Sequence, residues 1–120
     1  MVDIKTVGII GAGQMGSGIA HVCALGGYDV RLHDVSRERI DAGLALIGKN
    51  LARQVSRNII DQAAADAALA RITPAEGVEA IGQTDLAIEA ATENEEVKKA
   101  IFRSLQPHLQ PETLLASNTS

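Results

Sequence analysis

Three glycines near the start of the chain have the spacing G-x-G-x-x-G: Gly11, Gly13 and Gly16. Gly11 permits a tight turn, Gly13 has no side chain to obstruct a ligand, and Gly16 lets a helix approach a strand closely. The first turn of such a helix offers free N–H groups and a partial positive charge, which together attract an anion. These residues could therefore hold phosphate groups against the backbone. Glycine-rich turns are common, so the spacing needs support from the segments around it.

The segments around the glycines supply that support. Residues 5–10 are an apolar run typical of a strand buried on both faces, and residues 28–34 alternate as in a second strand that ends at Asp34. A carboxylate at that place accepts hydrogen bonds from ribose hydroxyls and repels a 2′-phosphate. The combination predicts a dinucleotide-binding β-α-β unit that prefers NAD to NADP. The alternative is a structural turn with an aspartate that caps the next helix.

The elements around these residues indicate the fold. Between the two strands, a helix is expected over residues 14–25, with its apolar stripe formed by Met15, Ile19, Val22 and Cys23. An antiparallel helical hairpin is inserted after the second strand, and short strands and helices alternate beyond it. We expect these later elements at residues 37–57, 61–70, 71–73, 78–81, 85–90, 94–105 and 114–117. The alternation predicts one α/β domain of Rossmann type, with a mostly parallel sheet and helices on both faces.

Composition narrows the classes of function. The chain has 120 residues, a net charge of −4 and no basic run, so nucleic acid is not an expected partner. No apolar stretch approaches the roughly 20 residues that span a bilayer, and the amino end lacks the pattern of a signal peptide. The single cysteine, Cys23, fits a reducing compartment. We expect a cytoplasmic protein with no membrane or metal partner.

Longer stretches of sequence carry a resemblance to a known family. The run VGIIGAGQMGSGIAHVCALGGYDVRLHD (residues 7–34) resembles the start of the 3-hydroxyacyl-CoA dehydrogenases, including the bacterial 3-hydroxybutyryl-CoA dehydrogenases. The resemblance continues through DLAIEAATENEEVKKAIF (85–102) and LLASNTS (114–120). The last segment discriminates best, because other β-hydroxyacid dehydrogenases share the glycine turn but not this ending. These later segments also argue against FAD as the cofactor.

The resemblance implies a function. It points to the NAD-binding portion of an oxidoreductase that interconverts 3-hydroxyacyl-CoA and 3-oxoacyl-CoA by hydride transfer. Two other interpretations stay open, namely the NAD-binding domain of another hydroxyacid dehydrogenase and a non-catalytic nucleotide-binding module.

The resemblance also implies roles for individual residues. Gln14 and Met15 are expected to donate backbone N–H groups to the pyrophosphate, while Asp34 holds the adenosine ribose. The complete set expected to bind the cofactor is Gly11, Ala12, Gly13, Gln14, Met15, Gly16, Asp34, Ala91, Glu93, Lys98, Asn118 and Ser120.

Five of these positions follow the strands expected at residues 85–90 and 114–117. Ala91 is expected to line the cofactor cleft, with Glu93 and Lys98 near the nicotinamide half of NAD. Asn118 and Ser120 are expected where cofactor and acyl substrate meet, with Ser120 hydrogen-bonded to the 3-oxygen of the substrate. On spacing alone, Glu93 and Lys98 would belong to a solvated helix surface, and Asn118 and Ser120 to an ordinary loop.

Hydride transfer from a 3-hydroxyl also needs a base. In the family this base is a histidine, oriented by a glutamate, and both lie beyond the ASNTS segment. His21, His33 and His108 are expected to be structural or exposed instead. We therefore expect an inactive fragment, which stops before the family's NAD-binding domain is complete. It would lack the helical domain that completes the acyl-CoA site and forms a homodimer, and its last strand could pair with another copy.

Overall fold

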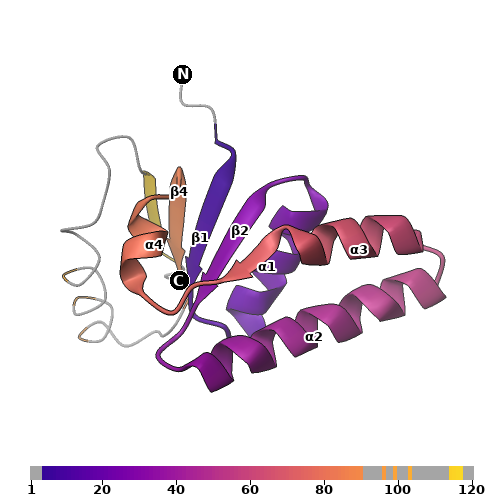
Figure 1. Cartoon of the computed structure of the whole chain (residues 1–120), viewed down its shortest axis with the longest axis horizontal. Coiled ribbons are helices and arrows are strands. Elements are labelled where there is room, and N and C mark those ends of the chain that lie inside the picture. Colours follow the sequence, from indigo (N-terminus) through magenta and orange to yellow (C-terminus); the bar gives the residue numbers. More distant parts are fainter. Residues whose placement is uncertain (1–3, 91–95, 97–98, 100–102, 104–113, 118–120) are drawn as a thin grey trace.

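A computed structural model of the chain describes residues 4–90, 96, 99, 103 and 114–117 (Figure 1). Its strands and helices alternate along the chain. They are β1 (Thr6–Ile10), α1 (Gln14–Leu25), β2 (Asp29–His33), α2 (Arg37–Ser56), α3 (Gln62–Ala70), β3 (Ile72–Pro74), α4 (Val78–Gly82), β4 (Leu86–Glu89) and β5 (Leu114–Ser117). Each agrees with an expected element to within about two residues. The helix expected over residues 94–105 lies mostly outside the described residues.

The five strands form one parallel sheet in the order β3-β2-β1-β4-β5. Figure 1 shows β1 near the middle of this sheet, with β2 and β4 beside it. The strand order and the parallel pairing confirm the predicted α/β class. The expected last strand, β5, lies at one edge of the sheet that the described residues form.

Helices cover both faces of β1, which explains why its sequence has no polar side chain after Thr6. Val7 and Ile9 are buried in the larger core cluster, which includes residues of α1, α2 and α3. Ile10 belongs to a second cluster with Ile81 of α4. Gly8 shares the α4 face, where a Cβ would lie 2.9 Å from Cγ2 of Ile81. The expectation of helices on both faces is confirmed.

Helices α2 and α3 form the predicted hairpin and lie side by side in Figure 1. Each begins at a side-chain cap. The Ser36 hydroxyl accepts a hydrogen bond from the N–H of Arg39, and a carboxylate oxygen of Asp61 accepts one from the N–H of Ala64. Such caps satisfy donors that have no partner within the helix.

Only half of the apolar stripe predicted for α1 packs against the core, because Ile19 and Cys23 are partly buried against the larger cluster but Met15 and Val22 are not. Met15 is 54% exposed and Val22 is 69% exposed. The buried residues of α1 are small or polar: Gly16, Ser17, Ala20, His21 and Ala24. Gly16 brings the start of the helix very close to the turn after β1, and the fully buried positions that follow on this face, Ala20 and Ala24, are small.

Two histidines have structural partners, as the sequence analysis expected. Nε2 of His21 lies 2.7 Å from Oε1 of Gln54 and so joins α1 to α2. Nδ1 of His33 lies 2.7 Å from the carbonyl oxygen of Ala75. His108 lies outside the described residues.

The carboxylate of Asp85 links the amino ends of β1 and β4 by hydrogen bonds. Oδ2 of Asp85 accepts hydrogen bonds from the N–H groups of Lys5, at 2.8 Å, and Thr6, at 3.0 Å, and from the Thr6 hydroxyl. These backbone hydrogen bonds hold the pKa of Asp85 below its ordinary value. Asp85 therefore stabilises the sheet at the edge opposite the glycine turn.

Candidate functional site

The strand order reverses direction at β1. From β1 the chain proceeds to β2 and β3 on one side, then crosses to β4 and β5 on the other. Open parallel sheets bind ligands outside the carboxyl ends of their strands at such a reversal. The glycine turn leaves β1 at this place, beginning with Gly11.

Two of the three glycines are required by the geometry of the turn. Gly11 has φ of +115°, which residues with a side chain rarely adopt, and its N–H donates to the carbonyl oxygen of His33 at 2.7 Å. A Cβ on Gly16 would lie 1.7 Å from the carbonyl oxygen of Gly11. The tight turn and the close helix–strand approach were both predicted from the spacing.

The amino end of α1 is open on its outer side. Gly13 is the N-cap, has no side chain to accept from the first turn, and is exposed. A Cβ built on Gly13 would meet no atom within 4 Å. The N–H groups of the first turn have no acceptor within the helix itself. A phosphate could therefore approach the backbone at Gln14 and Met15 without displacing a capping side chain.

Asp34 is bound directly to the glycine turn. Its Oδ2 accepts a hydrogen bond from the N–H of Ala12 at 2.8 Å, and its Oδ1 accepts one from the N–H of Val35. A carboxylate has about four acceptor positions, so both oxygens can accept further bonds. Asp34 does not cap α2, because Ser36 does. The alternative of an N-capping aspartate is therefore wrong.

A groove of about 210 Å³ lies between the glycine turn and α2. It is lined by Ala12, Gly13, Asp34, Arg39 and Ala42. This groove contains the predicted ribose acceptor and a residue of the phosphate turn.

The helix α2 can approach this turn closely because of Gly43. A Cβ there would lie 2.7 Å from the carbonyl oxygen of Ala12. The sequence analysis did not identify Gly43 or Arg39, because their importance depends on which side of α2 faces the turn.

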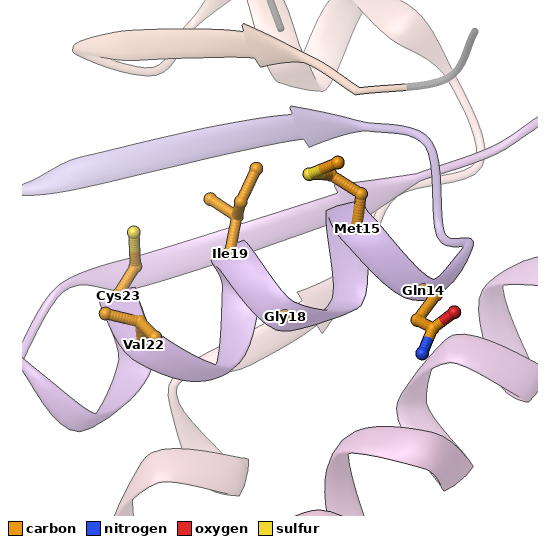
Figure 2. Close-up of a pocket in the computed structure, with 6 residues that line it drawn as sticks. All are labelled: Gln14, Met15, Gly18, Ile19, Val22 and Cys23. Carbon is orange, nitrogen blue, oxygen red and sulfur yellow. The ribbon is translucent and has the colours of Figure 1, made fainter.

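A larger groove of about 420 Å³ runs along α1 (Figure 2). It is lined by Gln14, Met15, Gly18, Ile19, Val22 and Cys23. Figure 2 shows the side chains of Met15, Ile19 and Cys23 projecting to the same side of the helix, with Gln14 pointing away from them.

The chemistry of this larger groove does not suit a dinucleotide. Its lining is almost entirely apolar, and it extends along α1 away from the turn. The one titratable side chain in the lining is Cys23, and burial raises the pKa of its thiol. The smaller groove, which is lined by Asp34 and Gly13, is therefore the better candidate for a dinucleotide site.

The structure brings together seven of the predicted site residues, namely Gly11, Ala12, Gly13, Gln14, Met15, Gly16 and Asp34. The other five, Ala91, Glu93, Lys98, Asn118 and Ser120, lie outside the described residues. The strands that precede them end at the same edge of the sheet, since Glu89 of β4 is in register with Ile10 of β1 and with Ser117 of β5. The roles of all twelve residues in binding remain predictions.

Glu89 is a further residue at this edge that sequence reasoning missed. It is the last residue of β4 and is only 1% exposed. Burying a carboxylate is costly unless it is paired or hydrogen-bonded, and Glu89 is not without such a partner. The sequence feature that could have identified Glu89 is a glutamate at the end of an otherwise apolar strand.

Among the described residues, no group of three or more His, Cys, Asp or Glu side chains could hold a metal ion. No helix in that part of the chain is long and apolar enough to cross a membrane.

Comparison with known proteins relates this geometry to a family. The family model described as 3-hydroxyacyl-CoA dehydrogenase, NAD binding domain, matches residues 6–120. The chain is 54% identical over 117 residues to the 3-hydroxybutyryl-CoA dehydrogenase of Bradyrhizobium diazoefficiens, covering 98% of this chain and 40% of that protein. It is 40% identical over 120 residues to the 3-hydroxyadipyl-CoA dehydrogenase of Escherichia coli, covering 100% of this chain and 25% of that protein.

Solved structures have the same fold. The crystal structure of (S)-3-hydroxybutyryl-CoA dehydrogenase from Ralstonia eutropha matches with a TM-score of 0.95 at 38% identity, over 98% of this chain and 42% of that one. The chain thus spans well under half the length of the relatives that it matches.

Proposed function

This chain belongs to the 3-hydroxyacyl-CoA dehydrogenase family, in its NAD-binding domain, and from that membership we propose that NAD binds across the glycine turn. The backbone N–H groups of Gln14 and Met15 bind the pyrophosphate, and Asp34 accepts hydrogen bonds from the adenosine ribose. The observation that carries this assignment is the 2.8 Å hydrogen bond from Ala12 to Asp34. It holds the ribose acceptor and the phosphate turn in one rigid arrangement.

We also propose the reaction of the longer protein that contains this domain. The names of the relatives support the interconversion of 3-hydroxyacyl-CoA and 3-oxoacyl-CoA. Bound NAD supplies the hydride acceptor for oxidation of the 3-hydroxyl. The part played by this domain is to bind the cofactor and to orient it at the edge of the sheet where β1, β4 and β5 end.

The remaining site residues complete this proposal. Ala91, Glu93 and Lys98 contribute to the nicotinamide half of the site, as the family resemblance implies. Asn118 and Ser120 position the acyl substrate, with Ser120 hydrogen-bonded to its 3-oxygen.

The base that removes the hydroxyl proton comes from another part of the protein. His21 and His33 already contact Gln54 and the carbonyl oxygen of Ala75, which supports this inference. The 120-residue chain by itself is accordingly proposed to be inactive, and to be less than the family's whole NAD-binding domain.

The expected partners follow from the same proposal. The substrate is an acyl-CoA, and the longer protein is proposed to be a homodimer. In the 120-residue chain, β5 lies at a sheet edge among the described elements, and pairing of two copies through it is a separate proposal. Light scattering at increasing concentration tests it, and a constant monomer mass would refute it.

Calorimetry tests the cofactor assignment directly. The chain should bind NAD, and Asp34→Ala should weaken binding at least about ten-fold, because hydrogen bonds to a charged acceptor contribute about 1.5–3 kcal/mol. Equal affinity for NAD and NADP would contradict the role of Asp34. For the reaction, the longer protein should oxidise NADH with acetoacetyl-CoA much faster than with small free oxoacids. The reverse preference would point to another class of hydroxyacid dehydrogenase.

A further inference from the structure

The groove beside the glycine turn contains two opposite charges. Asp34 and Arg39 both line it, together with Ala12, Gly13 and Ala42. Arg39 is the third residue of α2, and its backbone is fixed because its N–H donates to the hydroxyl of the N-cap Ser36 at 3.2 Å. The N-cap hydrogen bond therefore fixes the position of the Arg39 backbone, from which the guanidinium side chain extends.

The guanidinium of Arg39 differs in its contacts from that of the neighbouring Arg37. Among the described residues its guanidinium has no hydrogen bond or ion pair. Arg37, two residues earlier, differs: its Nε lies 2.9 Å from Oδ1 of Asp41, and its Nη1 lies 3.7 Å from Oε1 of Glu76. The first turn of α2 thus carries one arginine paired on the surface and one with an unpaired guanidinium that lines the groove.

The two charges act in opposite directions on a cofactor that carries a 2′-phosphate. The Asp34 carboxylate favours the two hydroxyls of an unmodified ribose and repels a phosphate. A guanidinium presents a planar set of donors that matches phosphate geometry. Because Arg39 and Asp34 line one groove of about 210 Å³, both would act on the same adenosine ribose.

We propose that Arg39 is a specificity-determining residue, whose guanidinium binds a 2′-phosphate in the same groove where Asp34 repels it. This inference rests on the proposed binding of NAD at the glycine turn. Arg39 limits how strongly the protein discriminates against NADP, and removal of the Asp34 charge alone suffices to admit the phosphorylated cofactor.

Calorimetry of the wild-type chain and three variants with two cofactors tests the proposal. Asp34→Asn removes the negative charge but keeps an oxygen that can accept from Ala12. It should strengthen NADP binding at least ten-fold relative to wild type. In the Asp34→Asn background, Arg39→Gln should weaken NADP binding about ten-fold, the effect of losing one charge-assisted contact. It should change NAD binding by less than about two-fold, since NAD has no 2′-phosphate.

A matched control uses the neighbouring arginine. Arg37→Gln in the Asp34→Asn background removes the same charge from the same helical turn, but Arg37 does not line the groove. It should leave NADP binding within about two-fold, because surface charges are screened by salt. Circular dichroism melting of each variant verifies that the fold is retained.

The possible results separate this inference from the proposed function. If the Asp34→Asn variant binds NAD but gains no affinity for NADP, the role of Arg39 is overturned and the NAD site stands. The same conclusion follows if Arg39→Gln and Arg37→Gln have equal effects on NADP. If the folded wild-type chain binds no NAD, the proposed site is overturned and the inference with it.

Discussion

The substitution Gly16→Ala should destabilise the protein although alanine is the better helix former. In the structure, the added Cβ would lie 1.7 Å from the carbonyl oxygen of Gly11 and 2.8 Å from its carbonyl carbon. Both atoms belong to the backbone of the glycine turn, so no side-chain rotation can relieve the overlap. Carbon and oxygen atoms in ordinary contact lie more than about 3 Å apart, since the optimal separation of non-bonded heavy atoms is about 3.5–4.0 Å. Helix α1 must therefore move by more than 1 Å, roughly, for normal contact to be restored.

The expected magnitude is the difference between two opposing terms. Replacing an interior helical glycine by alanine stabilises a helix by about 1 kcal/mol. Overpacking of a close contact costs about 1–3 kcal/mol, and more when backbone must shift. Because the contact here is between backbone segments, we expect the second term to exceed the first. The net loss should be about 1–3 kcal/mol in the free energy of unfolding.

Gly18 provides the control, because it lies in the same helix and a Cβ there would meet no atom within 4 Å. Gly18→Ala should therefore stabilise the protein by up to about 1 kcal/mol. Urea denaturation of both variants measures the contrast, and calorimetry shows whether Gly16→Ala also weakens NAD binding. Equal stability of the two variants would refute the argument that Gly16 is required by the close approach of α1 to the turn.

Three other predictions concern single contacts. Gly43→Ala should lower the free energy of unfolding by about 1–3 kcal/mol, because its Cβ would lie 2.7 Å from the carbonyl oxygen of Ala12. Gly48→Ala is the control, because a Cβ at Gly48 of the same helix lies in open space and should not lower the stability. Equal urea midpoints for the two variants would contradict the prediction. The lowered pKa of Asp85 means that its stabilising effect is complete above the unfolded value of about 3.9 and is lost as the pH falls through the folded value. The melting temperature of Asp85→Asn should therefore be below that of wild type at pH 7, and the gap should narrow as the pH falls below about 3.9. A gap that stays constant in acid would exclude this role. Burial raises the pKa of Cys23, so its alkylation at pH 7 should be slower than that of glutathione, and equal rates would show an accessible thiolate.

The parts of the site that were predictable from the sequence depend on local geometry. Gly11 and Gly16 follow from the conformations that a strand–turn–helix requires, and Asp34 follows from its distance along the chain. Gly43 and Arg39 were missed because they matter only through the way in which α2 packs against the turn. The burial of Glu89 likewise depends on elements that are distant in the sequence.

The error in the buried face of α1 has a related cause. Periodicity groups Met15 and Val22 with Ile19 and Cys23 in one apolar stripe, but Met15 and Val22 are exposed. Gly16 brings the start of the helix very close to the turn, and the fully buried positions that follow on this face, Ala20 and Ala24, are small. Hydrophobic periodicity measures side-chain size and polarity, but the distance between two elements is set by their closest contact.

The hydrogen bond between Asp34 and Ala12 makes two residues of the dinucleotide motif into one unit, and two substitutions at Asp34 can separate its functions. Asp34→Ala removes both the ribose acceptor and the bond that holds the turn. Asp34→Asn keeps one oxygen, which can accept from Ala12 or from the ribose but has fewer acceptor positions than a carboxylate. If the hydrogen bond from Ala12 to Asp34 contributes to affinity, Asp34→Ala should weaken NAD binding several-fold more than Asp34→Asn. Without that bond, the glycine turn must be ordered when the cofactor binds, which costs binding free energy. Equal losses in calorimetry would mean that the ribose contact alone accounts for the affinity and that the turn holds its conformation without Asp34.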